Sequence, residues 1–265
     1  MMATLRTSDL TEKPRPDLVI FYALDTSGSM AGERIQILNT AMENTIDALK
    51  KSRSADSHLK IAVLQYDTTA RWVNEVTAEY IEDFIWTNIE RPSGLTNVPA
   101  ALNELDQKMS KKEFLGLSRG DFMPIVIFMT DGMIDSQFLS DFALALDHLN
   151  DNLWFQGATK IGFAIGNDAD EDMVRKIVGD EGLCKTDDLQ SFADMLVKVS
   201  VKSALLNGTS RLAHVSGGSV ISSTRQGEGD GSTSMPEQKP DSSVWTWGNL
   251  SDGSGSGGWP AAGQW

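Results

Sequence analysis

The sequence is poor in cysteine and histidine, with one Cys and three His in 265 residues. Cys184 has no intrachain disulfide partner, so we expect a reducing compartment, the cytoplasm. A structural zinc site needs several Cys and His ligands, and His58, His148 and His214 are too scattered along the sequence to supply them. Long apolar runs are also missing. We therefore expect neither a signal peptide at the N-terminus nor a membrane span.

Basic residues are outnumbered as well. The 23 Lys and Arg face 37 Asp and Glu, giving a formal net charge of -14. This balance disfavours nucleic acid and anionic membranes as partners. It also raises the local concentration of divalent cations, although solubility alone explains an acidic surface. With 40% hydrophobic and 23% charged residues, the chain has the composition of a globular protein with one large domain.

Short apolar runs alternate with amphipathic ones along the chain, which predicts an α/β fold with a mostly parallel sheet. We expect strands at 18–24, 59–65, 70–76, 123–129 and 160–165. We expect helices at 33–49, 79–86, 97–109, 138–149, 170–178 and 189–201. The strands at 59–65 and 70–76 read as a hairpin, which adds one antiparallel strand at an edge of this doubly wound sheet, with helices on both faces.

The C-terminal part of the chain differs in composition. Residues 216–265 hold 11 Gly and 11 Ser and few aliphatic side chains, so this segment is expected to be flexible. We divide the chain into an extension, 1–15, a domain, 16–201, and a tail, 202–265. The tail holds four of the seven tryptophans, Trp245, Trp247, Trp259 and Trp265. They could dock on a partner or fold back weakly on the domain.

Oxygen-bearing side chains follow the first predicted strand directly. Asp25, Ser27 and Ser29 lie in a turn that Gly28 permits, and alternate spacing lets them converge. In an open parallel sheet, ligand sites lie beyond the carboxyl ends of the strands, and this turn is at such an end. An isolated Asp-x-Ser-x-Ser string is as readily a turn or a helix cap, because Asp and Ser favour those positions.

Two later segments can complete a site at the same edge. Thr96 lies in the loop Ser93-Gly94-Leu95-Thr96-Asn97 before a helix, and Asp131 ends another apolar strand. Each alone could be a cap, but their order and placement favour a common site. Two carboxylates and three hydroxyls suit a hard cation, with Mg²⁺ preferred and Mn²⁺ or Ca²⁺ as rivals.

The strings VIFYALDTSGSMAG, SGLTN and IVIFMTDG resemble the three parts of the metal-ion-dependent adhesion site of von Willebrand factor A (vWA) domains. The resemblance covers residues 16–201 and implies a Rossmann-like fold. Within the family, the bacterial branch linked to tellurium resistance looks most similar. The resemblance implies that Ser27 and Ser29 ligate the metal directly and that Thr96 does so in a ligand-bound state, while Asp25 and Asp131 act mainly through bound waters.

The resemblance also implies a function. The metal would bind an Asp or Glu of a protein partner, such as a kinase or phosphatase in a bacterial stress system, and the protein would not be an enzyme. Two alternatives stay open: a metal-assisted hydrolase or phosphatase that uses the same ion, and a scaffold that acts through the tryptophans of its tail. No residue is recognisably placed as a general base, which counts against the hydrolase.

Three other features of the sequence do not indicate a further functional site. The loop at 165–168 is more readily a turn than a ligand contact, and Cys184 is more readily a small core residue than a redox group. No spacing supports a second ion between Asp67 and Asp168.

Overall fold

The computed structural model describes residues 15–52, 57–115, 121–166, 169–186 and 188–207. Its centre is a seven-stranded sheet in the order β3-β2-β1-β5-β6-β7, with β4 also paired to β2. The strands are β1 (Asp17–Asp25), β2 (His58–Tyr66), β3 (Ala70–Trp72), β4 (Glu79–Tyr80), β5 (Ile125–Thr130), β6 (Thr159–Ile165) and β7 (Leu183–Thr186). β1, β2, β5, β6 and β7 are parallel, and β3 and β4 are antiparallel to β2. The predicted α/β fold is confirmed.

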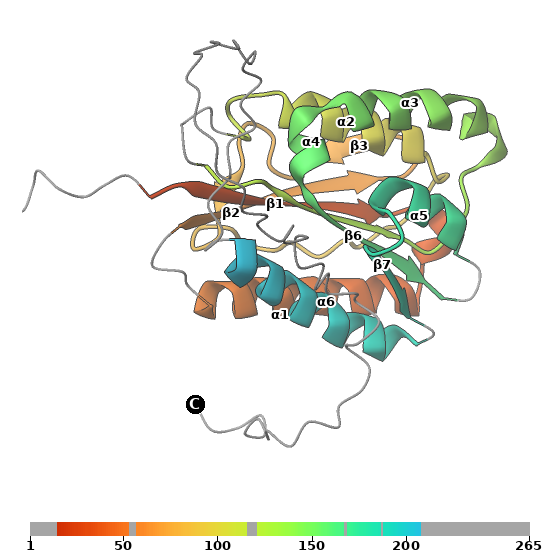
Figure 1. Cartoon of the computed structure of the whole chain (residues 1–265). Coiled ribbons are helices and arrows are strands. Elements are labelled where there is room, and N and C mark those ends of the chain that lie inside the picture. The colour runs from red at the N-terminus through yellow and green to blue at the C-terminus, as the bar shows by residue number, and fades with distance from the viewer. Residues whose placement is uncertain (1–14, 53–56, 116–120, 167–168, 187, 208–265) are drawn as a thin grey trace, which may run out of the picture. The chain divides into compact units, whose positions relative to one another are not determined.

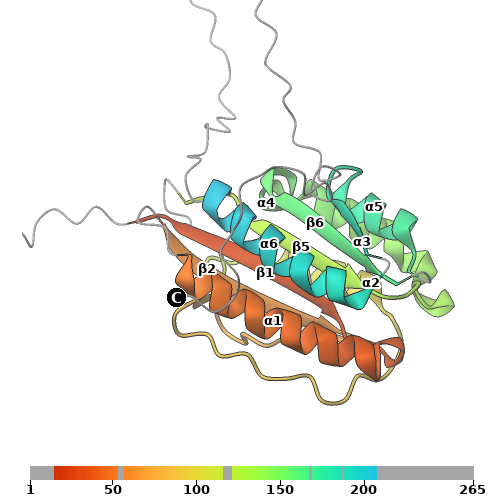
Figure 2. The same cartoon turned by 90° about the horizontal axis from the view of Figure 1, so that it is seen from below.

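Helices cover both faces of the sheet. They are α1 (Glu33–Lys51), α2 (Val98–Met109), α3 (Leu139–Asp151), α4 (Leu153–Gly157), α5 (Glu171–Val178) and α6 (Leu189–Asn207), with single 3-10 turns η2 (Gly28–Met30) and η3 (Ser136–Phe138). α1 and α6 pack side by side on one face, and α2, α3 and α4 lie on the other (Figures 1 and 2). This arrangement is the doubly wound fold predicted from the alternating pattern.

The core forms because the central strands are apolar on both sides. Every residue of β1 from Leu18 to Asp25 is buried. Val19, Phe21 and Ala23 join the core shared with α2, α3 and α5. The alternate residues of a strand point to the opposite face, which α1 and α6 cover. A strand buried on both faces must read as a continuous apolar run.

The parallel register brings the carboxyl ends of the central strands to one edge. Asp25 of β1 pairs with Tyr66 of β2, and Leu24 pairs with Met129 of β5. Tyr66 reinforces the alignment, since its hydroxyl donates to the Met129 carbonyl at 3.0 Å and its carbonyl accepts from Thr26 N at 2.8 Å. Segments that leave β1 and β5 therefore start side by side.

The hairpin beside β2 differs from the prediction. The strand expected at 70–76 ends at Trp72, because the side chain of Asn74 takes over the pairing: its Oδ1 accepts from Val63 N at 2.7 Å. The helix expected at 79–86 is wrong. Glu79 and Tyr80 form β4 on the free edge of β2, and Ile81 N donates to Leu59 O at 3.0 Å. Hydrogen bonds offered by that edge outweigh a weak local helical preference.

Three further elements differ from the expectation. Strand β7 was not predicted, because its four residues, LCKT, show no apolar run. The short helix α4 was not predicted either; Asn152 begins it by accepting from Trp154 N at 3.0 Å. Helix α6 continues to Asn207, beyond the expected end at Val201.

Cys184 is 4% exposed, which confirms its reading as a core residue. The four tryptophans of the tail, together with Asn167 and Asp168, lie outside the described residues. Within the described part of the chain, none of the helices has the length and apolarity needed to cross a membrane.

Candidate metal centre

Asp25 is one of the three predicted metal ligands that are almost fully buried. It is the last residue of β1 and only 1% exposed. Its Oδ1 accepts from the backbone N of Ser27 at 2.9 Å, which folds the chain back into the turn. Its Oδ2 accepts from the Thr130 hydroxyl at 2.7 Å. The end of β5 therefore fixes the carboxylate that the end of β1 supplies.

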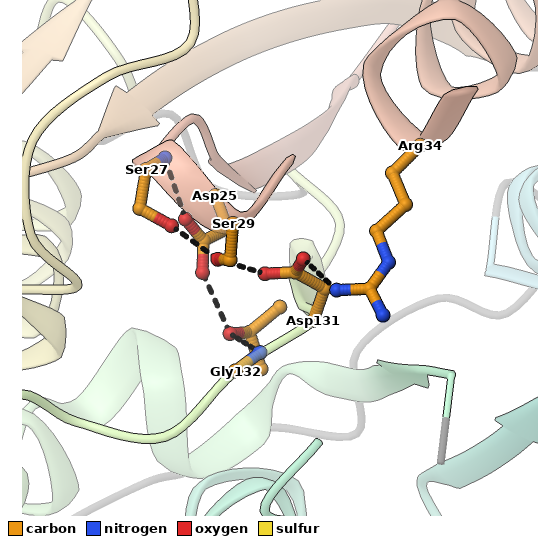
Figure 3. A network of polar contacts seen from close by, with 7 residues as sticks. Asp25, Ser27, Ser29, Arg34, Asp131 and Gly132 are labelled. Atoms are coloured by element: carbon orange, nitrogen blue, oxygen red, sulfur yellow. Dashed lines mark hydrogen bonds and ion pairs between the residues drawn. The ribbon is translucent and has the colours of Figure 1, made fainter. Parts of the chain in front are cut away.

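Ser27, Ser29 and Asp131 form a continuous chain of contacts (Figure 3). The hydroxyls of Ser27 and Ser29 lie 3.0 Å apart, and Ser29 donates to Asp131 Oδ1 at 2.8 Å. Asp131 is fully buried, Ser27 is 1% exposed, and Ser29 is exposed. Segments 102 residues apart in sequence thus meet, with Ser29 on the solvent side.

Thr96 approaches from the loop before α2. Gly28 N donates to the Gly94 carbonyl at 3.0 Å, which ties this loop to the turn after β1. A Cβ placed on Gly132 would lie 3.6 Å from the Ser29 hydroxyl and 3.8 Å from the Thr96 hydroxyl. The two hydroxyls therefore converge on the backbone beside Asp131. All five predicted residues come together at this edge of the sheet.

Asp135 and two glycines shape the loop that carries Thr96. Thr96 N donates to Asp135 Oδ2 at 2.7 Å, and Asp135 N donates to Thr96 O at 3.3 Å. Gly94 has a φ of +83°, a backbone conformation that favours glycine. A Cβ on Gly28 would lie 3.3 Å from the Gly94 carbonyl. Glycine at both positions allows the two loops to approach closely.

Sequence reasoning missed three residues of this network: Arg34, Thr130 and Asp135. Thr130 precedes Asp131 at the end of a predicted strand, so its place at the edge could have been inferred. Asp135 had a weaker signal, its position four residues after Asp131. Arg34 had none: its Nη1 lies 2.5 Å from Asp131 Oδ2, a contact that depends on where the fold places the start of α1 relative to the segment that follows β5.

The electrostatics of the site favour a bound cation. Burial raises the pKa of Asp25 from an ordinary 3.8 to about 6; hydrogen bonds from Ser27 and Thr130 oppose this, and the charge of Asp131 adds to it. A divalent cation would offset both the burial and the repulsion. Its ligands would have to include hydroxyls, because the described residues contain no cluster of three or more His, Cys, Asp or Glu suited to a metal.

A separate pocket of about 310 Å³ lies at the opposite end of β1 and β2. Leu18, His58 and Leu205 are among the residues that line it, and none of the five candidate ligands does. The candidate centre is thus a group of polar atoms at the rim of the sheet, away from this pocket.

A family model identifies the domain. The model described as the von Willebrand factor type A domain matches residues 17–199, which include the whole sheet and all five candidate ligands. The chain belongs to the vWA family. Domains of this family commonly bind divalent metal ions and mediate protein–protein interactions.

Solved structures show the same fold. A von Willebrand factor type A protein from Catenulispora acidiphila matches with a TM-score of 0.54 and 18% identity, over 71% of this chain and 43% of that one. Proximal thread matrix protein 1 of the mussel byssus matches with a TM-score of 0.53 and 19% identity, over 72% of this chain and 48% of that one. The vWF domain of the pilus tip protein Mfa5 from Porphyromonas gingivalis matches with a TM-score of 0.54 and 10% identity, over 74% of this chain and 97% of that one.

The chain therefore spans less than half of the first two of these structures. At such identities the similarity concerns the vWA fold alone. No curated protein sequence matches the chain.

Proposed function

We propose that this vWA domain binds one divalent cation through Asp25, Ser27, Ser29, Thr96 and Asp131, and uses it to hold an acidic side chain of a protein partner. The observation that carries the proposal is the convergence of two buried carboxylates and three hydroxyls from three separate segments. Oxygen ligands of this kind suit Mg²⁺, with Mn²⁺ and Ca²⁺ as alternatives.

Resemblance to the metal sites of the vWA family suggests a role for each residue. Ser27, Ser29 and Thr96 would ligate the cation directly through their hydroxyls. Asp25 and Asp131 would act mainly through water, and hydrogen bonds hold both carboxylates in place. With neutral groups closest to it, the cation keeps a strong attraction for an additional anionic ligand. The Asp or Glu of the partner would be that ligand.

The surface beside the site supports a protein as the partner. Leu95 is 39% exposed and Met133 is 66% exposed. Leu95 precedes Thr96, and Met133 follows Gly132. Hydrogen bonds between Thr96 and Asp135 join the two loops that carry them. Exposed apolar side chains beside a polar centre are typical of protein interfaces.

A metal-assisted hydrolase or phosphatase is the second candidate function. The basic side chain that contacts Asp131 is the guanidinium of Arg34, which stays protonated and cannot act as a general base. This contact favours binding over catalysis. Turnover of a phosphoester that disappears in Asp131→Ala would favour the hydrolase instead.

The cellular setting remains a prediction from the sequence. It comprises the cytoplasm, a bacterial stress system resembling tellurium resistance, and a kinase or phosphatase as the partner. A scaffold that acts through the tryptophans of the tail is the third reading. Affinity purification from native cells, with and without residues 216–265, distinguishes that reading from binding at the metal centre.

The direct test removes two hydroxyls without altering the charge. In Ser27→Ala with Ser29→Ala, calorimetry with Mg²⁺ or Mn²⁺ should show no site of the wild-type affinity, and capture of the partner should no longer depend on the metal. Ser140→Ala with Ser191→Ala, two exposed serines of α3 and α6, is the matched control. Wild-type protein that captures its partner equally well in EDTA would contradict the proposal.

A further inference from the structure

Arg34 is a cation beside the candidate metal centre, close to its most buried carboxylate. Its Nη1 lies 2.5 Å from Asp131 Oδ2, and the Arg34 side chain is 25% exposed while that of Asp131 is fully buried. The other carboxylate oxygen, Oδ1, accepts from Ser29 at 2.8 Å. Figure 3 shows Asp131 between Ser29 and Arg34. One oxygen thus faces the hydroxyls, and the other faces the guanidinium.

The charge balance of the centre follows from this arrangement. Asp25, Asp131 and the nearby Asp135 supply negative charge around the centre, and the positive charge of Arg34 offsets part of it. With or without a bound cation, the centre is therefore one unit of charge less negative than it would be with a neutral residue in place of Arg34. Partial burial weakens screening by solvent, so a single charge at this distance has a large effect on ion binding.

We propose that Arg34 weakens binding of the divalent cation and strengthens binding of an anionic group to the cation-loaded centre. The proposal rests on the proposed metal site and specifies how that site favours a carboxylate from the partner. The guanidinium repels the incoming cation and competes with it for Asp131. Once the cation is bound, the same positive charge attracts the acidic side chain of the partner.

A purely structural role for Arg34 predicts a different outcome. An ion pair that only fixes the start of α1 or the position of Asp131 would, when lost, weaken both metal binding and anion binding. The charge-balance role predicts effects of opposite sign. The sign of the change in metal affinity therefore separates the two.

The experiment measures both affinities on the full chain. Calorimetry should show that Arg34→Met binds Mn²⁺ about tenfold more tightly than wild type. Acetate is the anionic probe, followed through the water-proton relaxation of bound Mn²⁺, and its affinity for the loaded variant should fall by a similar factor. Arg34→Lys keeps the charge and should restore wild-type behaviour in both titrations.

A matched control removes a charge elsewhere. Lys60 pairs with Asp17 at 2.6 Å, and Asp17 starts the strand that Asp25 ends, so about 25 Å of extended chain separates the two carboxylates. Lys60→Met should leave both affinities unchanged. If circular dichroism shows that Arg34→Met does not fold, Arg34→Gln replaces it.

The outcomes separate this inference from the proposed function. Unchanged or weaker Mn²⁺ binding by the charge-neutral variant, with normal binding by wild type, would overturn the role of Arg34 and leave the metal site standing. Wild-type protein that binds no Mn²⁺ would overturn both.

Discussion

Asp25 shows how the fold holds a charged group where charge is unfavourable. The carboxylate is 1% exposed and accepts from Ser27 N and the Thr130 hydroxyl. These donors reduce the cost of burial but do not remove it, and the charge of Asp131 adds to it, so the pKa is raised to about 6. The folded chain without metal thus takes up a proton that the unfolded chain releases.

The sign of the pH dependence follows. Between the ordinary pKa of 3.8 and the raised value near 6, the folded protein holds one proton more than the unfolded chain. Its free energy of unfolding in EDTA should therefore fall as pH rises through this window, by about 2–3 kcal/mol from this group. Urea titrations at pH 4.5 and 6.5, with Asp25→Asn for comparison, check this.

Metal binding should show the opposite trend. Because the cation requires the ionised carboxylate, Mn²⁺ affinity should rise with pH and level off above the raised pKa of Asp25. A stability difference between wild type and Asp25→Asn that does not change across the window would contradict the buried, proton-binding role of this carboxylate.

At the level of elements, the loop before α2 depends on Gly94. Its φ is +83°, and a Cβ would lie 2.6 Å from the Thr68 hydroxyl, which itself accepts from Leu95 N at 2.9 Å. Any larger residue there must displace either the Thr68 hydroxyl or the backbone of the segment that carries Thr96. The position of Thr96, a candidate metal ligand, thus depends on the backbone of a nearby residue.

Gly94→Ala tests this dependence. The positive φ alone should cost about 1–2 kcal/mol of stability. Displacement of Thr96 should also weaken Mn²⁺ binding by about tenfold, the equivalent of about 1.4 kcal/mol. Thermal unfolding and calorimetry on the same samples give the two values.

The control for Gly94 is a glycine that has a similar positive φ but room for a Cβ. Gly179, at the end of α5, has a φ of +84°, and a Cβ there would meet nothing within 4 Å. Gly179→Ala should lose similar stability and keep its metal affinity. Equal metal affinity in both variants would show that the clash with Thr68 does not move Thr96.

For the molecule as a whole, the candidate centre joins segments far apart in the sequence. Asp25 and Thr130 are 105 residues apart, and Ser29 and Asp131 are 102 apart. A cation bound by Asp25, Ser29 and Asp131 is held by the folded chain and not by the unfolded one. Its binding energy therefore adds to the stability of the fold.

Metal should therefore raise the free energy of unfolding of the wild type. At a concentration one hundred times the dissociation constant the gain should be about 2.7 kcal/mol. Hydrogen exchange should slow at the three loops together. Urea unfolding with Mn²⁺ or EDTA, and hydrogen-exchange mass spectrometry, measure these effects.

The double variant Ser27→Ala with Ser29→Ala controls for unspecific binding. A chain with a formal net charge of -14 attracts cations everywhere on its surface. Stabilisation of equal size in this variant would mean that the gain comes from the acidic surface and not from the centre.

Local pattern was sufficient for the central elements. β1 and β5 were predictable because strands buried on both faces must be apolar throughout, and α1 because its apolar residues repeat at helical spacing. The five candidate ligands could also be placed at one edge, since the carboxyl ends of parallel strands meet there.

Only the tertiary structure decided the rest. β4 forms because β2 offers an unpaired edge, a partner that no local pattern of residues 79–86 reveals. Arg34 reaches Asp131, 97 residues away in sequence, because the fold brings the start of α1 to the segment that follows β5. Residue periodicity reports which face of an element is buried, but the contacts across elements depend on how those faces are packed together.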